Sequence, residues 1–436
     1  MFDYEELAKQ TAKNTRISTK ENPGIEKAKK KFGKQFVERL LKMKELDMKQ
    51  FSKKEQKTIN KLMDLDYGPL VYQGVSGKYK IKTKVGETVL IAYSETDERC
   101  VRLAKELRNE CWRLGCAVSM KPVNEQDSKT YYKIAPEDSL VELPPISEIL
   151  SKNIDMRFFV GDTKDPNWSK GLEKKMKLSA PISMRLWQIQ DKRKVRWCIL
   201  GFPVEMNKKD YIVPKEKYER VYRDSIEESF SEDTVRLCNY YRKALEKGDR
   251  VIITADDGTN LSFSIKGRPV LVADGVIDEE DVKRGDIGLN IPDGETFLAP
   301  LEYSANGRVR FDYTRINGFG VFRDFWLTFK NGKVVRFEGS EEDKKKWKKF
   351  MDSNTGEKDR IAELGIGTNK KADMIGTIIV DEKIYGTIHI AIGNNTGAYH
   401  GKNVASSHQD MIKRMKGMNG KIFVDGKLVM KDGEPI

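Results

Sequence analysis

The chain has 436 residues, more than one hydrophobic core usually organises, so the sequence predicts two domains. Hydrophobic residues make up 38% and aromatic residues 9% of the chain, which excludes a mostly disordered protein. The net charge of +13 raises nucleic acid as a partner, but residues 1–60 alone supply +7 of it, and elsewhere acids and bases are mixed. This distribution favours a solvated charged surface over a nucleic-acid partner.

The sequence offers no sign of a membrane or secretory protein. No stretch approaches 18 uninterrupted apolar residues, so no membrane-spanning helix is predicted. The first ten residues, MFDYEELAKQ, are acidic and no apolar run follows them, which argues against a signal peptide. An odd number of cysteines without a CxxC pair predicts reduced thiols in a cytoplasmic protein. These cysteines are Cys100, Cys111, Cys116, Cys198 and Cys238.

Three segments are predicted in chain order. Residues 1–85 form a basic helical extension, in which Phe36, Leu40 and Met43 recur near helical spacing. Residues 86–247 begin with an apolar strand at 88–93, a helix at 96–114 with its own apolar stripe, and a second strand at 117–120. This βαβ unit predicts an α/β domain with a partly parallel sheet.

From Gly248 the pattern changes to short strands separated by tight turns such as Pro292-Asp293-Gly294. Residues 248–436 are therefore predicted to form an α+β domain with an antiparallel sheet. Its expected strands are 250–254, 260–265, 269–272, 296–300, 308–311, 334–337 and 384–392, and its expected helices are 341–353, 356–364 and 408–415.

The chain has only three histidines, His389, His400 and His408, and all lie within twenty residues of one another. Such clustering suggests a metal or acid–base site, although a single histidine is more often an ordinary core or surface residue. In the strand at 384–392, alternation places the isoleucines on one face and His389 on the other, among small residues. That face could be a ligand site or simply solvated.

Three acidic residues are further candidates, each with an ordinary alternative. Asp410 lies two residues after His408 at the predicted start of a helix, where Ser407 and Asp410 would also make a capping box. Glu363 ends the predicted helix 356–364, where the helix dipole disfavours a carboxylate unless a cation compensates it. Glu295 begins a predicted strand and would alone be taken as an exposed acid.

Four segments containing these residues resemble the thermophilic metallo-aminopeptidase family M29, the aminopeptidase T and aminopeptidase S group. The match is specific because the segments occur in the family's order within about 120 residues, and it extends weakly over residues 86–436. They are NIPDGETFLAP at 290–300, AELGIGTN at 362–369, DEK with GTIHIAIG at 381–383 and 386–393, and HQDMI at 408–412.

The resemblance implies that Glu295, Glu363, His389, His408 and Asp410 ligate two divalent ions, Co²⁺, Zn²⁺, Mn²⁺ or Mg²⁺. It also implies a cytoplasmic, dimeric exopeptidase that releases N-terminal amino acids from short peptides. A water activated by the ions would attack the peptide bond. Glu363 is the candidate for the residue that takes the proton of this water.

The sequence departs from the family at three places. Residues 1–85 extend the usual start, and the segment from His389 to His408 is short. Where the family has a tyrosine seven residues after the first histidine, this chain has Thr396, and Tyr399 could support the oxyanion instead. Two alternatives therefore stay open: a metal-binding relative that lacks peptidase activity or acts on another amide, and a nucleic-acid-associated protein that uses the basic extension.

Overall fold

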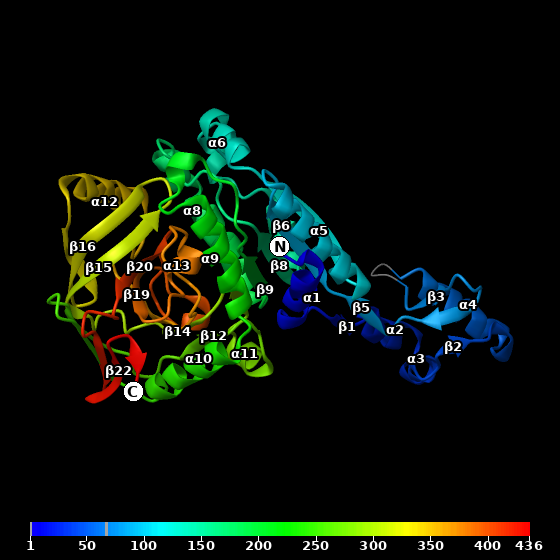
Figure 1. The fold of residues 1–436 in the computed structure, drawn as a ribbon. Helices are drawn as coiled ribbons and strands as arrows, with labels where there is room; N and C mark the ends of the chain where they lie inside the picture. The colour runs from blue at the N-terminus through cyan, green and yellow to red at the C-terminus, as the bar shows by residue number, and fades with distance from the viewer. Residues whose placement is uncertain (1, 66–68) are drawn as a thin grey trace.

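The computed structural model describes residues 2–65 and 69–436 and shows a small N-terminal part projecting from a larger body (Figure 1). Within the predicted helical extension, the chain is divided into α2 and α3 at Gly33, whose φ of 93° a helix cannot continue. The N-terminal elements begin with α1 (Tyr4–Asn14), which packs against the body. They continue with β1 (Thr19–Glu21), α2 (Gly24–Phe32), α3 (Lys34–Leu41), β2 (Glu45–Leu46), η1 (Met48–Gln50), α4 (Lys53–Met63), β3 (Val71–Gln73), β4 (Tyr79–Ile81) and β5 (Lys84–Gly86).

A five-stranded parallel sheet forms the middle of the molecule and confirms the predicted α/β fold class. Its strands follow the order β13-β9-β8-β6-β7, and β13 comes from the chain beyond Gly248. The strands are β6 (Thr88–Ser94), β7 (Ala117–Val123), β8 (Met156–Val160), β9 (Arg196–Leu200) and β13 (Gly288–Ile291). The connecting helices are α5 (Glu98–Arg113), α6 (Glu125–Ile134), η2 (Asp138–Val141), α7 (Pro145–Asn153), α8 (Glu173–Lys192), η3 (Lys208–Asp210), α9 (Lys215–Glu228) and α10 (Glu232–Leu245).

Two features of these helices bear on the rest of the chain. The N-terminal helix α1 packs on α5 and shares its hydrophobic cluster with the parallel sheet and α9. None of the helices in residues 2–65 and 69–436 is both long and apolar enough to cross a membrane.

The C-terminal part is built on a thirteen-stranded antiparallel sheet, which confirms the predicted α+β class. Its main path is β12-β14-β18-β19-β20-β15-β11-β10-β21-β22-β23, and β16 and β17 extend from β15. The strands are β10 (Arg250–Thr254), β11 (Asn260–Ser264), β12 (Leu271–Ala273), β14 (Glu295–Leu298), β15 (Asn306–Ile316), β16 (Gly320–Lys330), β17 (Lys333–Glu338), β18 (Ile361–Gly367), β19 (Thr387–Gly393), β20 (His408–Arg414), β21 (Lys421–Val424), β22 (Lys427–Lys431) and β23 (Glu434–Pro435). The helices are α11 (Glu279–Arg284), α12 (Glu341–Ser353), α13 (Ile378–Asp381) and η4 (Gly397–Tyr399).

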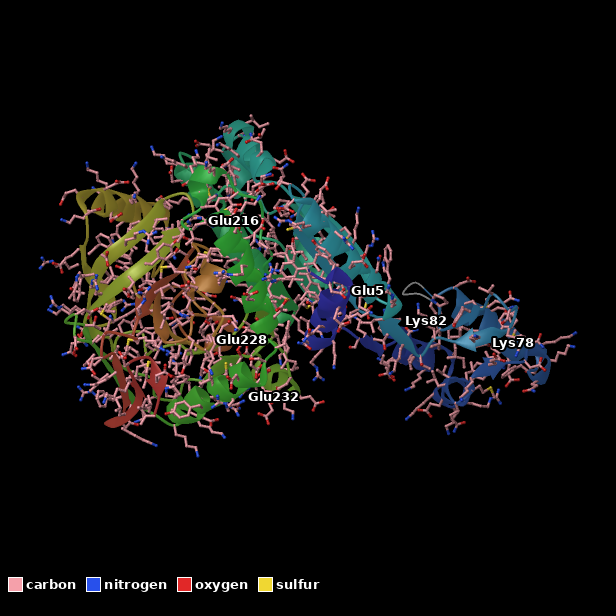
Figure 2. All side chains as sticks on the ribbon, viewed as in Figure 1. Glu5, Lys78, Lys82, Glu216, Glu228 and Glu232 are labelled. Carbon is pink, nitrogen blue, oxygen red and sulfur yellow. The ribbon has the colours of Figure 1, made fainter. Side chains whose placement is uncertain are left out.

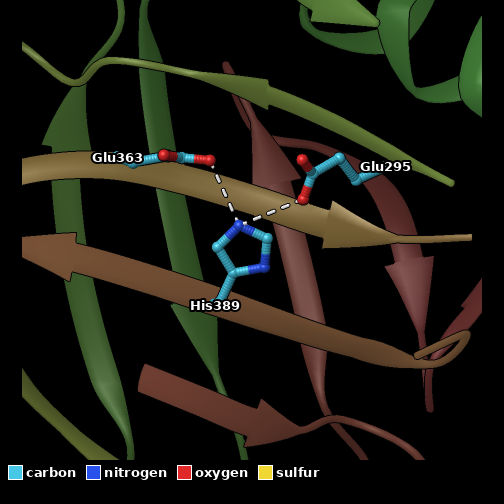
Figure 3. A group of neighbouring side chains, drawn as sticks. All are labelled: Glu295, Glu363 and His389. Carbon is cyan, nitrogen blue, oxygen red and sulfur yellow. Dashed lines mark hydrogen bonds and ion pairs between the residues drawn. The ribbon is translucent and has the colours of Figure 1, made fainter. Parts of the chain in front are cut away.

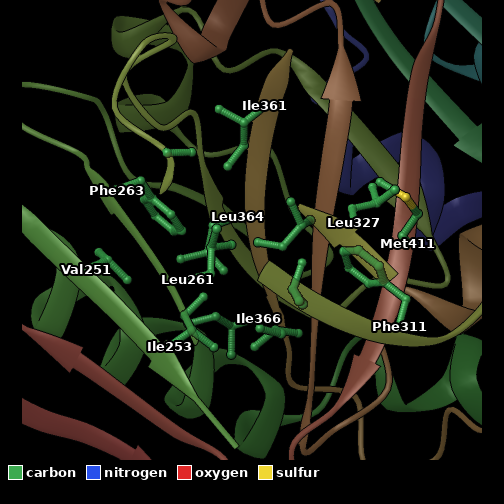
Figure 4. Close-up of a cluster of buried hydrophobic side chains, with 14 of the residues drawn as sticks. Val251, Ile253, Leu261, Phe263, Phe311, Leu327, Ile361, Leu364, Ile366 and Met411 are labelled. Carbon is green, nitrogen blue, oxygen red and sulfur yellow. The ribbon is translucent and has the colours of Figure 1, made fainter. Parts of the chain in front are cut away.

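One face of this sheet encloses a large apolar core (Figure 4). Ile388, Ile390 and Ile392 of β19 belong to it and are fully buried. Because side chains alternate along a strand, His389 lies on the opposite face of β19, as the sequence predicts.

Two predicted helices are wrong. The end of the predicted helix 356–364 lies in β18, which begins at Ile361. Most of the predicted helix 408–415 is the strand β20, so Ser407 and Asp410 make no capping box. Both strands lie inside the sheet, β18 between β14 and β19 and β20 between β19 and β15. A strand buried on both faces loses the alternation that distinguishes it from a helix, because neighbours such as Met411 and Ile412 are both inside.

The core predicts the effect of truncating Ile390. Ile390→Ala removes fully buried methyl groups, so we expect the free energy of unfolding to fall by about 2–5 kcal/mol. Ile146→Ala is the matched control, because this isoleucine of α7 is 64% exposed and its truncation should change stability by about 0.5 kcal/mol or less. Urea denaturation measures both, and equal effects would contradict the assignment of the core.

Candidate metal centre

Four neighbouring strands bring the five predicted ligands together. Glu295 lies on β14, Glu363 on β18, His389 on β19, and His408 and Asp410 on β20, and these strands are adjacent in the sheet in that order. The residues are up to 115 positions apart in the chain, so the antiparallel pairing of the strands creates the cluster.

Glu363 lies at the centre of the cluster and contacts both histidines. His389 Nε2 lies 3.1 Å from Glu363 Oε1 and 3.4 Å from Glu295 Oε2 (Figure 3). His408 Nε2 lies 3.0 Å from Glu363 Oε2 and 3.4 Å from Asp410 Oδ1. The cluster therefore consists of two groups of three side chains that share Glu363, and in each group the possible ligand atoms lie within 4.8 Å of one another.

The burial of these groups fits a site for cations. Glu295, Glu363 and His389 are at least 95% buried, and His408 forms the more accessible side. Within the described residues, Glu295 Oε2 and Asp410 Oδ1 are buried without a hydrogen-bond partner. A buried carboxylate oxygen without a partner is costly, and a mixed set of carboxylates and imidazoles suits divalent ions such as Zn²⁺, Co²⁺ and Mn²⁺.

Backbone carbonyls orient both imidazoles. His389 Nδ1 lies 3.1 Å from the carbonyl oxygen of Glu382, and His408 Nδ1 lies 2.7 Å from that of Asn394. Because a carbonyl oxygen only accepts hydrogen bonds, each Nδ1 carries a proton and donates it. The Nε2 atoms then face the carboxylates, as in histidines that bind metals through Nε2.

Gly365 makes room for the ring of His389 on the neighbouring strand. A Cβ atom at this position would lie 1.9 Å from His389 Nε2. Gly365 pairs directly with His389 across β18 and β19, so any larger residue would displace the imidazole from the cluster.

The carboxylates strongly favour positive charge at the histidines. Burial opposes the protonation of His389, but the hydrogen bond to Glu363 and the charge of Glu295 raise the pKa of His389 to about 9. For Glu363, burial alone would raise the pKa, because it disfavours the charged carboxylate. Hydrogen bonds from His389 and His408 instead hold this pKa far below its usual range. The carboxylates of the cluster therefore favour positive charge at the positions of the Nε2 atoms.

Lys383 is a buried cation beside the cluster that the sequence did not single out as a site residue. Its Nζ is fully buried and donates to Glu295 Oε1 at 2.5 Å and to Glu382 Oε1 at 2.7 Å. One oxygen of Glu295 is thus engaged, and the other faces His389. The signal in the sequence was a lysine that follows an acidic pair and precedes an apolar strand. This lysine also lies within one of the four family segments.

Tyr399 reaches the cluster, whereas Thr396 does not. The hydroxyl of Tyr399 donates to Glu363 Oε2 at 2.8 Å, and its ring lies 5.5 Å from Phe297 and 5.8 Å from His408 between centroids. The hydroxyl of Thr396 instead exchanges hydrogen bonds with the side chain of Asn394.

The third histidine and an acidic residue just after the first family segment lie outside the cluster. His400 is exposed and follows η4 in a left-handed conformation. Glu302, which continues the first family segment, pairs with Arg268 at 2.5 Å and accepts from the backbone N–H of Lys402 at 2.7 Å. The clustering of the three histidines in sequence therefore identified two site residues and one surface residue.

The chain is similar to a known protein family and to solved structures. A family model described as thermophilic metalloprotease (M29) matches residues 55–434. Among solved structures, wild-type AmpT from Thermus thermophilus is similar, with a TM-score of 0.61, 18% identity, and coverage of 81% of this chain and 94% of that chain. The 2,5-dihydroxypyridine dioxygenase from Pseudomonas putida KT2440 gives a TM-score of 0.53, 16% identity, and coverage of 80% and 92%. The comparison with curated proteins gives no match.

The contacts of Lys383 predict a large effect on stability. Lys383→Met leaves two buried carboxylates without their cation, so we expect the free energy of unfolding to fall by about 3–5 kcal/mol in the presence of chelator. Lys416→Met is the matched control, because this lysine is 61% exposed and its pair with Glu434 should contribute about 1 kcal/mol at most. Urea denaturation compares the two variants, and a loss no larger than that of the control would contradict the role of Lys383.

Proposed function

We propose that this chain, which belongs to the thermophilic metalloprotease family M29, is an aminopeptidase acting on short peptides. The family match confirms the resemblance found in the four sequence segments. The observation that carries the proposal is the convergence of two imidazoles and three carboxylates from four strands, with Glu363 shared between two groups.

We propose the same five residues as ligands of two divalent ions. Glu295, Glu363 and His389 would hold one ion, and Glu363, His408 and Asp410 would hold the other. When bound, such ions supply a nucleophilic water at neutral pH and polarise the scissile carbonyl. The donor set suits Co²⁺, Zn²⁺ and Mn²⁺ and leaves Mg²⁺ as a weaker candidate, because imidazole nitrogen is a poor ligand for Mg²⁺.

Two residues are proposed to act on the substrate directly. Glu363 is buried at the centre of the cluster and would accept the proton of the attacking water and pass it to the leaving amine. Tyr399 donates a hydrogen bond within the cluster and would turn this hydroxyl toward the carbonyl oxygen as negative charge develops there. Lys383 would position Glu295 without touching the substrate.

A metal-binding protein without peptidase activity is the second candidate. Thr396 stands where the family has its tyrosine, and its hydroxyl is engaged by Asn394. A dioxygenase also shares the fold, so the fold alone does not select the reaction. The position of Tyr399 favours the peptidase, because it restores a phenol hydroxyl to the cluster.

We also propose that the protein is cytoplasmic and acts as a homodimer. All five cysteines are free and buried, which supports a reducing compartment. The homodimer is supported by the resemblance to the family.

Removal and return of metal tests the proposed activity. Chelated protein should release no amino acid from Leu-, Met- or Phe-initiated peptides, and Co²⁺, Zn²⁺ or Mn²⁺ should restore release. His389→Ala and Glu363→Ala should each lower kcat/KM more than about 100-fold, because they remove ligand atoms and not merely their hydrogen-bond partners.

His400→Asn is the matched control for these variants, since it removes the third, exposed histidine and asparagine tolerates its left-handed backbone. Its activity should equal that of the parent protein. Peptides with an acetylated N-terminus should resist cleavage if the enzyme is an aminopeptidase. Stoichiometric metal binding without cleavage of any peptide would replace the proposal with the second candidate.

The proposed role of Tyr399 predicts an effect on kcat. Tyr399→Phe should lower kcat by about 100- to 1,000-fold with little change in KM, as expected for the loss of one donor to the developing oxyanion. Tyr303→Phe, at a tyrosine that is 70% exposed, should leave kcat unchanged. Both are assayed at full metal content, and an unchanged kcat in Tyr399→Phe would remove this residue from the mechanism.

A further inference from the structure

The segment 22–82, here called the N-terminal module, has the topology of a winged helix-turn-helix domain. After α2 and α3 come the short strand β2, the single turn η1, the longer helix α4, and a hairpin of β3 and β4. The sheet order is β2-β4-β3, so the second strand of the hairpin returns to pair with the strand that precedes α4. In helix-turn-helix proteins, the later helix of such a unit is the one that enters the major groove of DNA.

This module has a hydrophobic core of its own, apart from the body that carries the metal cluster. Ile59 and Leu62 of α4 are fully buried against residues of α2, α3, β2 and β3. The module joins the body through β1 and β5 and projects away from it, as Lys78 and Lys82 mark in Figure 2. Its surface is therefore open to a partner without affecting the metal cluster.

Most of the protein's net charge is concentrated in this module. Residues 22–82 contain 16 lysines and arginines against seven acidic residues, a net charge of +9 out of +13 for the whole chain. The sequence alone favours a solvated surface for the basic extension, but the fold places most of its lysines and arginines on one compact unit. A compact domain with this excess of charge has the electrostatic character of a nucleic-acid-binding module.

The exposed face of α4 carries three lysines with i, i+3, i+7 spacing, Lys54, Lys57 and Lys61. Among the residues that the structure describes, none of their ammonium groups pairs with a carboxylate. The acid within α4, Glu55, is instead bound by Arg39 and by the N-cap Ser52. The face therefore presents uncompensated positive charge along a helix about 16 Å long.

We propose that the N-terminal module binds double-stranded DNA, with the lysine face of α4 in the major groove and the hairpin of β3 and β4 beside it. The major groove of B-DNA admits an α-helix, whereas the major groove of an RNA duplex is too narrow for side chains to read. Lysines act as point charges toward phosphates and read bases poorly, so the binding has little sequence preference.

Binding to a fluorescently labelled 24-base-pair DNA duplex tests the proposal with the full chain. Fluorescence anisotropy at 50–300 mM KCl should show a Kd that rises steeply with salt. The triple variant Lys54→Gln, Lys57→Gln, Lys61→Gln should weaken binding at least about tenfold at 100 mM salt. It should also reduce the slope of log Kd against log salt by about 2.7, from three lost phosphate contacts.

The matched control replaces three exposed lysines of α12, in Lys345→Gln, Lys348→Gln, Lys349→Gln, and should bind like the parent chain. The charge-conserving variant Lys54→Arg, Lys57→Arg, Lys61→Arg should also retain binding, which separates charge from folding of the module. Absence of binding at 50 mM salt, an equal loss in the α12 variant, or equal affinity for an RNA duplex of the same sequence would each overturn the proposal.

Discussion

A carboxylate buried in a β-sheet must have a cation beside it, and the C-terminal part of this protein is organised around that constraint. Glu295, Glu363 and Glu382 are all inside the protein. The single ammonium group of Lys383 is shared between Glu295 and Glu382, while Glu363 is held between the imidazoles. The remaining deficit of positive charge lies at the orphaned oxygens of the cluster, and it can be met by ions that enter from the side of His408.

This arrangement separates permanent from exchangeable positive charge. Lys383 is covalently part of the chain and fully buried, and its ammonium group holds Oε1 of Glu295. The imidazoles have the Nδ1 proton committed to backbone carbonyls, so each has one free nitrogen for a proton or an ion. If the proposed ions bind, they would take the place of the protons on the Nε2 atoms, at side chains that the strands already hold together.

Much of the α/β part was predictable, because β6, α5 and β7 each show a clear local period. The strands β18 and β20 were not, since burial on both faces erases the alternation of strands, and Glu363 and Asp410 were mistaken for helix-terminal acids. The proposed ligands were singled out only because several weak signals agreed with the order of the family's segments. Lys383 was not singled out because one of its two carboxylate partners, Glu295, lies 88 residues away in the chain, and no local pattern reports such a contact.

The shortened loop after β19 shows why chain position is a poor guide to chemistry. Thr396 occupies the tyrosine position of the family, yet a reacting carbonyl responds to where a hydroxyl lies and not to its sequence number. The turn η4 lies in the connection between β19 and β20. It brings the hydroxyl of Tyr399 to within 2.8 Å of Glu363 Oε2. The ring is supported by Phe297 and His408, so the hydroxyl is held by packing as well as by its hydrogen bond. A phenol hydroxyl therefore reaches the cluster in this chain from η4, three residues after Thr396.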